Sequence, residues 1–227
     1  MYSALETYRT ELLRWNEQIS LVSREQPESR VAALLGLCAA GRSALQEGAE
    51  AVAPEAAAHL AGGRFGYVDI GSGGGLPGIP WRLMEDGGVP GETWLVEPRE
   101  KRAWFLDRIV HLLRLRDTRV SRARWGEEAL GPADLASPPV WLLSLMALRL
   151  TDAQILEGWS RAVRGRLGAA DATIIIARLR PSLRPDHVSA ELREELDLPV
   201  GPDSRLVPLR EAGAALLLSV HRPARRA

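Results

Sequence analysis

Four residues at alternate positions carry the clearest chemical signal in this chain of 227 residues: Asp69, Gly71, Gly73 and Gly75. They follow an apolar run that has the length and composition of a buried strand. Glycine has no Cβ atom, so a glycine-rich bend can turn sharply and let a flat or charged ligand approach the backbone. We therefore expect a ligand-binding loop at the carboxyl end of the first strand of a parallel sheet, where open α/β folds bind their ligands.

A carboxylate follows this loop at the end of the next apolar run. Glu97 stands directly after residues 93–96, at about the distance of 20 residues that separates a glycine loop from a ribose-binding acid. A carboxylate in this place can accept hydrogen bonds from both hydroxyls of a ribose. The loop and Glu97 together predict a ligand that contains a nucleoside.

Two classes of nucleoside cofactor fit the loop. Gly73, Gly75 and Gly78 match the G-x-G-x-x-G pattern of dinucleotide-binding folds. Two prolines interrupt the segment where that pattern should begin a helix, which counts against a dinucleotide site. The objection does not decide the matter, because proline is tolerated in a first helical turn. Asp69 belongs to the S-adenosylmethionine pattern and not to the dinucleotide pattern, so we favour S-adenosylmethionine over a nicotinamide or flavin cofactor. A glycine-rich turn without any ligand is the third and least favoured alternative.

The remaining sequence predicts an α/β fold that would hold this loop at the edge of a sheet. From residue 64 onward, short apolar runs alternate with helical patterns, as is typical of parallel βαβ units. We expect strands at 65–70, 93–96, 119–121, 140–145 and 172–177, and a terminal hairpin at 205–208 and 215–220. The intervening helices are expected at 78–84, 99–115 and 151–166.

Helices also precede the predicted sheet. One apolar stripe recurs at spacings of three and four residues, which is typical of a helix that packs on another element: Leu5, Tyr8, Leu12, Trp15 and Ile19. A second helix is expected at 30–45, followed by a weak helix or connector at 46–63. The chain is therefore predicted to comprise an N-terminal helical region, residues 1–62, and a main domain, residues 63–227.

The composition is that of a globular protein, with 46% hydrophobic and 26% charged residues. No apolar run reaches the roughly 18 residues of a membrane helix, and the first residues do not resemble a signal peptide, so we expect a cytoplasmic protein without a membrane partner. The 4 histidines are scattered, so no metal site is expected. The net charge is zero, but residues 97–124 contain 9 cations and 4 acids, which suits either a polyanion-binding face or a solvated helix.

Four segments of the chain resemble the glucose-inhibited division protein B family of bacterial methyltransferases, which modify guanine N7 in small-subunit (16S) ribosomal RNA. They are "WNEQISLVS", "DIGSGGGLPGIP", "VEPREKRAWFLDRIVHLLRL" and "RLVPLREAGAALLLSVHR". The resemblance implies a class I S-adenosylmethionine-dependent methyltransferase, with a Rossmann-like, mostly parallel seven-stranded sheet and an N-terminal helical extension. It also implies S-adenosylmethionine as cofactor, and small-subunit ribosomal RNA or the assembling small subunit as partner. We expect a monomer.

The resemblance assigns roles to individual residues. The cofactor residues that it implies are Asp69, Gly71, Ser72, Gly73 and Gly75 for methionine and ribose, Glu97 for the ribose, and Trp125 and Gly126 beside the adenine. The arginines expected to contact RNA are Arg122, Arg124, Arg178 and Arg180. Ser144 and Arg178 are the candidates for residues near the reacting atoms.

The chain departs from the family pattern on the substrate side. The segment "SLMA", which begins at Ser144, replaces an Arg-Ala pair after the fourth strand, and "ARLRP" replaces a Lys-Gly pair after the fifth. Guanine N7 has an exposed lone pair, so its methylation needs positioning and no general base. We favour a 16S ribosomal RNA guanine-N7 methyltransferase. A noncatalytic RNA- or ribosome-binding paralogue and a small-molecule methyltransferase stay open as alternatives.

Overall fold

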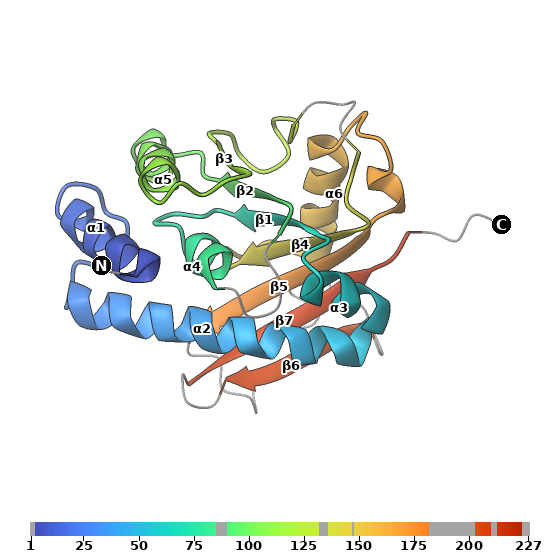
Figure 1. The fold of residues 1–227 in the computed structure, drawn as a ribbon, viewed down its shortest axis with the longest axis horizontal. Helices are drawn as coiled ribbons and strands as arrows, with labels where there is room; N and C mark the ends of the chain where they lie inside the picture. Colours follow the sequence, from blue (N-terminus) through green and yellow to red (C-terminus); the bar gives the residue numbers. More distant parts are fainter. Residues whose placement is uncertain are drawn as a thin grey trace.

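A seven-stranded sheet forms the centre of the molecule in a computed structural model, which describes residues 3–84, 90–131, 136–146, 148–181, 203–209 and 213–223. Its strands are β1 (Gly66–Ile70), β2 (Glu92–Val96), β3 (Thr118–Ser121), β4 (Val140–Leu145), β5 (Thr173–Pro181), β6 (Ser204–Leu209) and β7 (Ala214–His221). Their spatial order is β3-β2-β1-β4-β5-β7-β6 (Figure 1). The first five strands pair in parallel, whereas β7 is antiparallel to both of its neighbours.

This topology confirms the class I methyltransferase fold. The strand order runs outward from β1 in both directions, so the chain reverses its direction of winding between β1 and β4. Beyond the carboxyl ends of two such strands lies a crevice, because their connections go to opposite sides of the sheet. The glycine loop follows β1 and therefore lies at this switch point.

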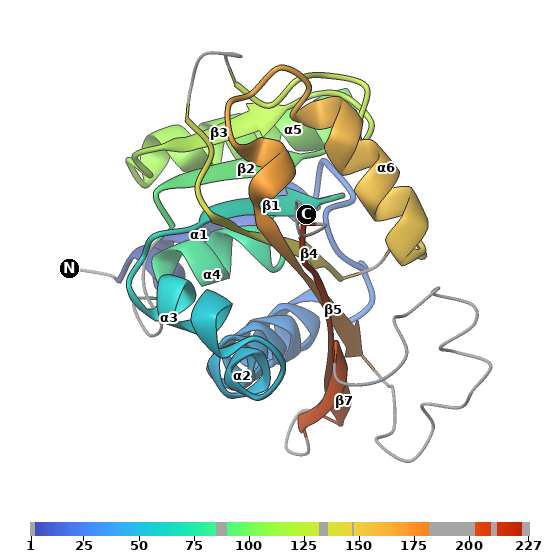
Figure 2. The same ribbon diagram turned by 90° about the vertical axis from the view of Figure 1, so that its right-hand side faces the viewer.

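Helices cover both faces of the sheet, as parallel sheets require. The helices are α1 (Ala4–Asn16), α2 (Pro27–Val52), α3 (Pro54–Ala61), α4 (Gly78–Leu83), α5 (Glu100–Leu112) and α6 (Asp152–Ala162), and a short 3-10 helix, η1 (Ala169–Asp171), precedes β5. Residues of α1 to α5 join one hydrophobic cluster, and α6 joins a second cluster on the other face. Figure 2 shows α2, α3 and α4 on one side of the sheet and α6 on the opposite side.

The N-terminal helices are longer than the sequence pattern predicts. Residues 46–52 of the expected connector continue α2, and residues 54–61 form α3. Alanine and glutamate favour helix in this stretch, and the break comes at Ala53 because the next residue, Pro54, begins a new helix at its first position. Helix α5 ends earlier than expected, at Leu112, since Arg114 has a φ of 51°.

The helices of residues 1–62 and the sheet share one hydrophobic core. Tyr8 and Leu12 from α1, and Leu45 from α2, are fully buried in the same cluster as Ile79 of α4 and Leu179 of β5. The predicted boundary after residue 62 falls in the turn that follows α3. It stays a prediction, and the shared core means that the helical region depends on the sheet for its burial.

Candidate active site

The glycine loop bends sharply over the carboxyl end of β2. Gly71, Gly73 and Gly75 have φ angles of 71°, 57° and 95°, a region that other residues rarely adopt. The backbone N–H groups of Gly71 and Ser72 both donate to the carbonyl oxygen of Val96, at 2.8 and 3.0 Å. The loop is thus fixed to the neighbouring strand at the point where a ligand would approach its backbone.

Asp69 lies beneath the loop and does not line its open side. Its side chain is 1% exposed, and its two carboxylate oxygens accept hydrogen bonds from Ser144 Oγ at 2.6 Å and from the N–H of Gly78 at 3.2 Å. Tyr67 extends this buried chain, with its hydroxyl 2.8 Å from Ser144 Oγ. Burial raises the pKa of Asp69 to about 6, although these hydrogen bonds oppose the rise. Asp69 therefore joins β4 and the start of α4 to the loop.

Glu97 faces the space beside the loop. One oxygen of its carboxylate accepts a hydrogen bond from the N–H of Gly73 at 3.0 Å, and the other accepts one from the N–H of Arg99 at 2.9 Å. A carboxylate offers about four lone-pair positions, so about two remain for a ligand. The carboxylate is both positioned by the loop and able to accept further hydrogen bonds.

A cleft of about 580 Å³ opens at the carboxyl ends of β1 and β2. Its lining residues are Ile70, Gly71, Val96, Glu97, Pro98, Arg99, Arg102, Arg124, Trp125, Leu148, Leu150, Gln154, Glu157 and Arg161. Of the predicted site residues, the structure brings Gly71, Glu97, Arg124 and Trp125 together in this cleft. The predicted residues Ser72, Gly73, Gly75 and Gly126 belong to the adjoining loops and not to the cleft lining.

Trp125 packs between the cleft and α6. Its indole N–H donates to the carbonyl oxygen of Ile155 at 3.0 Å. A Cβ atom added at Gly158 of α6 would lie 2.1 Å from the indole nitrogen, so any larger residue would displace the ring. Gly158 is a site residue that the sequence pattern did not reveal, because a single glycine in a helix gives no local signal of what it faces.

The N-terminal helix supports the glycine loop from behind. The hydroxyl of Tyr8 donates to the carbonyl oxygen of Gly74 at 2.7 Å, and burial raises the pKa of this hydroxyl, so it remains a donor. Arg102, which lines the cleft, donates to the carbonyl oxygen of Ser20 at 2.5 Å. The helical stripe in the sequence predicted that Tyr8 packs on another element, but not that this element is the loop.

The two candidates for residues near the reacting atoms are buried behind the cleft. Ser144 is fully buried in the Asp69 hydrogen-bond chain. Arg178 is 1% exposed and forms an ion pair with Asp152, and it donates to the carbonyl oxygen of Leu150 at 3.2 Å. Burial raises the pKa of Asp152, but the hydrogen bond from His221 and the charge of Arg178 outweigh it, so the net shift is downward. Arg178 thus lies in the interior and holds the segment 148–152, which contributes to the cleft.

The other arginines expected to contact RNA occupy different environments. Arg122 is exposed and forms an ion pair with Asp107 at 2.5 Å. Arg124 is exposed at the cleft. Arg180 is half-buried on β5, away from the cleft lining. Ala147, in the segment that replaces the family's Arg-Ala pair, lies outside the described residues.

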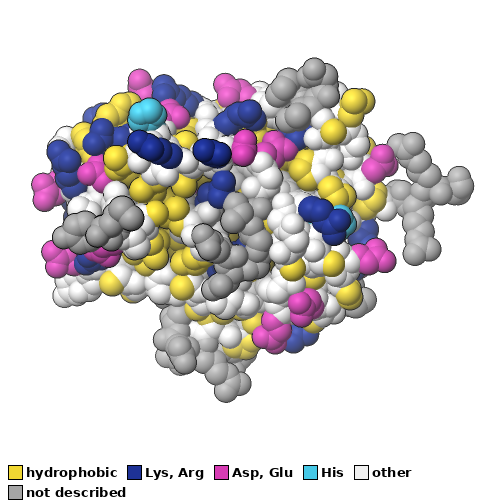
Figure 3. All heavy atoms as spheres, viewed as in Figure 1, with side chains coloured by type: hydrophobic (Ala, Val, Ile, Leu, Met, Phe, Trp, Pro, Cys, Tyr) yellow, Lys and Arg dark blue, Asp and Glu magenta, His cyan; other side chains and the backbone are white. Residues whose placement is uncertain are grey.

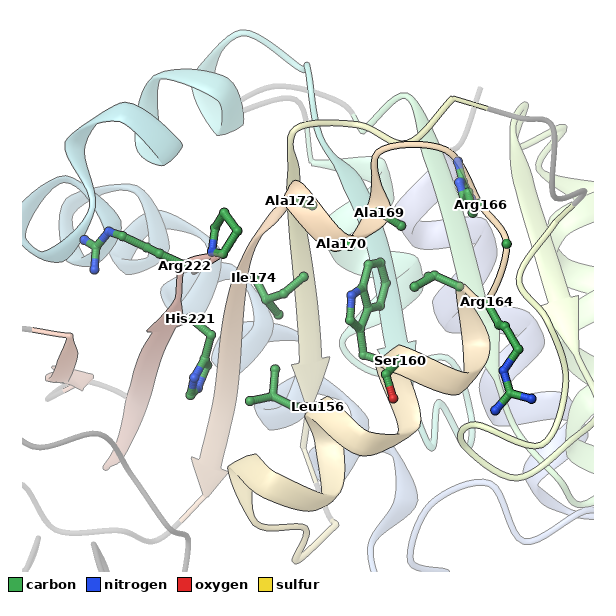
Figure 4. A pocket seen from close by; sticks show the side chains of 14 residues that line it. Leu156, Ser160, Arg164, Arg166, Ala169, Ala170, Ala172, Ile174, His221 and Arg222 are labelled. Atoms are coloured by element: carbon green, nitrogen blue, oxygen red, sulfur yellow. The ribbon is translucent and has the colours of Figure 1, made fainter. Parts of the chain in front are cut away.

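A second pocket, of about 490 Å³, lies at the opposite end of the sheet, between α6, η1 and the paired ends of β5 and β7 (Figure 4). Two of its three arginines already have acidic partners, because Arg166 pairs with Glu92 and Arg222 with Asp203. In Figure 4, the side chains of Arg164 and Arg222 point away from the centre of the pocket. This pocket lacks both the glycine loop and the strand-end acid, so we place the candidate active site in the cleft.

The described residues offer neither a cluster of metal ligands nor a membrane-spanning helix. They contain no group of three or more His, Cys, Asp or Glu side chains that could hold a metal ion. None of the helices assigned within them is long and apolar enough to cross a membrane.

Comparison with known proteins gives one family. A family model described as rRNA small subunit methyltransferase G (GidB) matches residues 1–137. The ribosomal RNA small subunit methyltransferase G of Desulfotalea psychrophila is 30% identical over 132 residues, which cover 55% of this chain and 49% of that protein. Its counterpart in Lawsonia intracellularis is 60% identical over 38 residues, or 17% of this chain and 16% of that protein. The match therefore spans about half the length of the first relative and less of the second.

Solved structures with a similar chain path include two from bacteria. A putative methyltransferase from Escherichia coli is 14% identical, with a TM-score of 0.44 over 82% of this chain and 87% of that one. An rRNA methylase from Streptococcus thermophilus is 14% identical, with a TM-score of 0.46 over 74% of this chain and 92% of that one. Both TM-scores are below 0.5, so the assignment of the class I fold depends on the strand order of the sheet.

Proposed function

Because this chain belongs to the rRNA small subunit methyltransferase G family, we propose that it is an S-adenosylmethionine-dependent methyltransferase that modifies guanine N7 in small-subunit (16S) ribosomal RNA. The observation that carries this proposal is the position of Glu97, which lines the cleft beside the glycine loop with lone pairs available. Membership of the family supports the reaction and the substrate class, and the cleft supports the proposed place of the cofactor.

The residues around the cleft fit S-adenosylmethionine. A volume of about 580 Å³ lies within the range of small-ligand and cofactor sites. Glu97 would hold the two ribose hydroxyls, and Trp125 offers an aromatic wall for the adenine. The backbone of Gly71 borders the same space and would face the methionine part. Asp69 and Tyr8 would act indirectly, since both fix the loop from its buried side.

When bound, the cofactor supplies a methyl group on a positively charged sulfur. Guanine N7 is unprotonated at neutral pH, so the protein has no proton to remove, and positioning alone can lower such a barrier by about 7 to 11 kcal/mol. We infer that Arg178, through Asp152 and the carbonyl of Leu150, positions the segment 148–152 at the cleft. Ser144 would serve the same end through Asp69.

Cations around the cleft support an RNA substrate. Arg99, Arg102 and Arg124 line it together with Arg161, and the acids in its lining are Glu97 and Glu157. Arginine side chains of this kind bind phosphates and so position an RNA strand. We propose that Arg124, and Arg122 beside it in the chain, contact phosphates near the target nucleotide.

Calorimetry with S-adenosylmethionine tests the cofactor part of this proposal. Wild-type protein should bind it at sub-millimolar concentration, and Glu97→Ala should weaken binding by about tenfold or more, since a hydrogen bond to a charged group contributes about 1.5 to 3 kcal/mol. Glu55→Ala, which removes an exposed carboxylate from α3, is the matched control and should bind as the wild type does. Absence of binding by the wild type would remove the proposal.

Transfer of a labelled methyl group tests the substrate part. Unmodified small-subunit RNA should accept label on guanine N7. Cofactor binding without incorporation into RNA would favour the noncatalytic paralogue, and incorporation only into small molecules would favour a small-molecule methyltransferase. Purified RNA and assembling particles should be compared as acceptors.

A further inference from the structure

An exposed tryptophan lies close to the cleft on α5. Trp104 is 41% exposed, and its ring packs edge-on against Trp15 of α1, with 4.8 Å between ring centroids and 71° between ring planes. Lys101 lies one turn before Trp104 on α5, and the described residues place no carboxylate within ion-pair distance of its ammonium group. We call the group formed by Arg14, Trp15, Lys101, Trp104 and Arg108 the Trp104 surface.

Hydrogen bonds and cations fix the geometry of this surface. The guanidinium groups of Arg14 and Arg108 lie 6.0 and 5.5 Å from the ring centre of Trp15. Glu11 accepts from both of these arginines and from the indole N–H of Trp15, the last at 3.1 Å. One acid thus orients two cations and one aromatic ring, and Lys101 adds a further positive charge. The surface has a net positive charge and an exposed aromatic side chain, that of Trp104.

The Trp104 surface is continuous with the cleft. A side pocket of about 350 Å³ lies between them, lined by Ile19, Ser20, Arg99, Glu100, Lys101 and Arg102. Arg99 and Arg102 line this side pocket and the cleft alike. Figure 3 shows Lys and Arg side chains among hydrophobic ones over the part of the molecule where Figure 1 places α5. A strand that leaves the cleft over its rim would therefore meet Lys101 and then Trp104.

We propose that the Trp104 surface binds the single-stranded RNA next to the target nucleotide, with one base stacked on Trp104 and phosphates beside Lys101 and Arg108. This inference rests on the proposed RNA substrate. From Lys101 to Arg108, α5 advances about 10 Å, the length of about three stacked nucleotides. Aromatic rings interleaved with cations are the usual means of binding single-stranded nucleic acid. The positive charge favours RNA over an apolar protein partner or a second copy of the chain.

Substitutions on this surface give a direct test by RNA binding and by steady-state kinetics. Trp104→Ala should weaken the binding of unmodified small-subunit RNA by about tenfold, because a stacked base contributes about that factor. It should raise KM for RNA by a similar factor and leave kcat and the affinity for S-adenosylmethionine unchanged. Trp104→Phe should keep most of the affinity, since a smaller ring still stacks. Lys101→Gln should reduce the slope of log affinity against log salt by about 0.7.

Leu167→Ala is the matched control. Leu167 is 64% exposed and precedes β5 at the opposite end of the sheet, so its removal should change none of these quantities. The inference would be overturned if Trp104→Ala bound RNA as tightly as the wild type, or if it lost cofactor affinity in parallel. A Trp104→Ala effect confined to self-association or to a protein partner would also overturn it. Failure of the wild type to bind S-adenosylmethionine would instead contradict the proposed function, so the two failures are distinct.

Discussion

The buried carboxyl of Asp69 should leave a signature in the pH dependence of stability. Burial raises its pKa to about 6 in the folded protein, from an ordinary value of 3.8. Between these two values, the folded protein keeps a proton that the unfolded chain has released. Asp69 therefore favours the folded state most strongly below pH 3.8, and this contribution is lost as the pH rises through about 6.

Replacement of Asp69 by asparagine should abolish this part of the pH dependence. A shift of about two pKa units corresponds to about 3 kcal/mol. We thus expect the difference in unfolding free energy, wild type minus Asp69→Asn, to fall by about 2 to 3 kcal/mol between about pH 4 and about pH 7. Urea denaturation of both proteins across this range measures it, and groups that titrate alike in the two proteins cancel in the difference.

A difference that stays constant over this range, or that rises with pH, would refute the reasoning. Ser144→Ala provides a second check, because Ser144 Oγ donates to Asp69 at 2.6 Å and its loss should move the transition to higher pH. Glu55→Gln, on the exposed face of α3, controls for the loss of a carboxylate as such.

Three further predictions follow from close contacts. Gly158→Ala should destabilise the protein by about 1 to 3 kcal/mol and weaken cofactor binding, because the new Cβ atom would overlap the indole of Trp125 that lines the cleft. Gly36→Ala, which has open space around it, is the control and should stabilise α2 by up to about 1 kcal/mol. Thermal unfolding measures the stability of both variants, and calorimetry measures their affinity for the cofactor. Tyr8→Phe should cost about 1 to 3 kcal/mol in denaturant unfolding, because a buried loop carbonyl loses its donor; an unchanged midpoint would count against that contact. Glu92→Gln should lower the unfolding free energy by about 3 to 5 kcal/mol, because it leaves the buried guanidinium of Arg166 without its charge partner, and a smaller loss in Arg166→Met is the matched comparison.

The sequence was sufficient to predict the sheet and the place of the loop. Alternating apolar runs and helical periods predicted every strand of the sheet, including the final antiparallel pair, because these patterns reflect burial along the chain. The boundaries were less accurate where tertiary contacts decide them. The alanines and glutamates of residues 46–52 are compatible with a helix, but the packing of this part of α2 on β6 and β7 leaves no local pattern in the sequence.

The site was only partly predictable, for a related reason. Glycines and Glu97 have a fixed spacing along the chain, so the sequence located them beside the cleft. The orientation of Asp69 depends on Ser144 from another strand, and the support of the loop depends on Tyr8 from the first helix. Contacts between residues so far apart in the chain leave no periodic signal. The same holds for Arg178, whose charge suggested a surface role and whose partner is a buried acid.

Because β7 is synthesised after the other six strands, the sheet can be completed only late in synthesis. This strand is the last of the seven along the chain, yet it lies inside the sheet and joins β6 to β5. Until the ribosome has released residues 214–221, the outer side of β5 displays unpaired backbone groups that can recruit a strand from another nascent chain. A frameshift or stop codon shortly before residue 214 should therefore yield an aggregation-prone product, even though the whole cofactor cleft has already been translated.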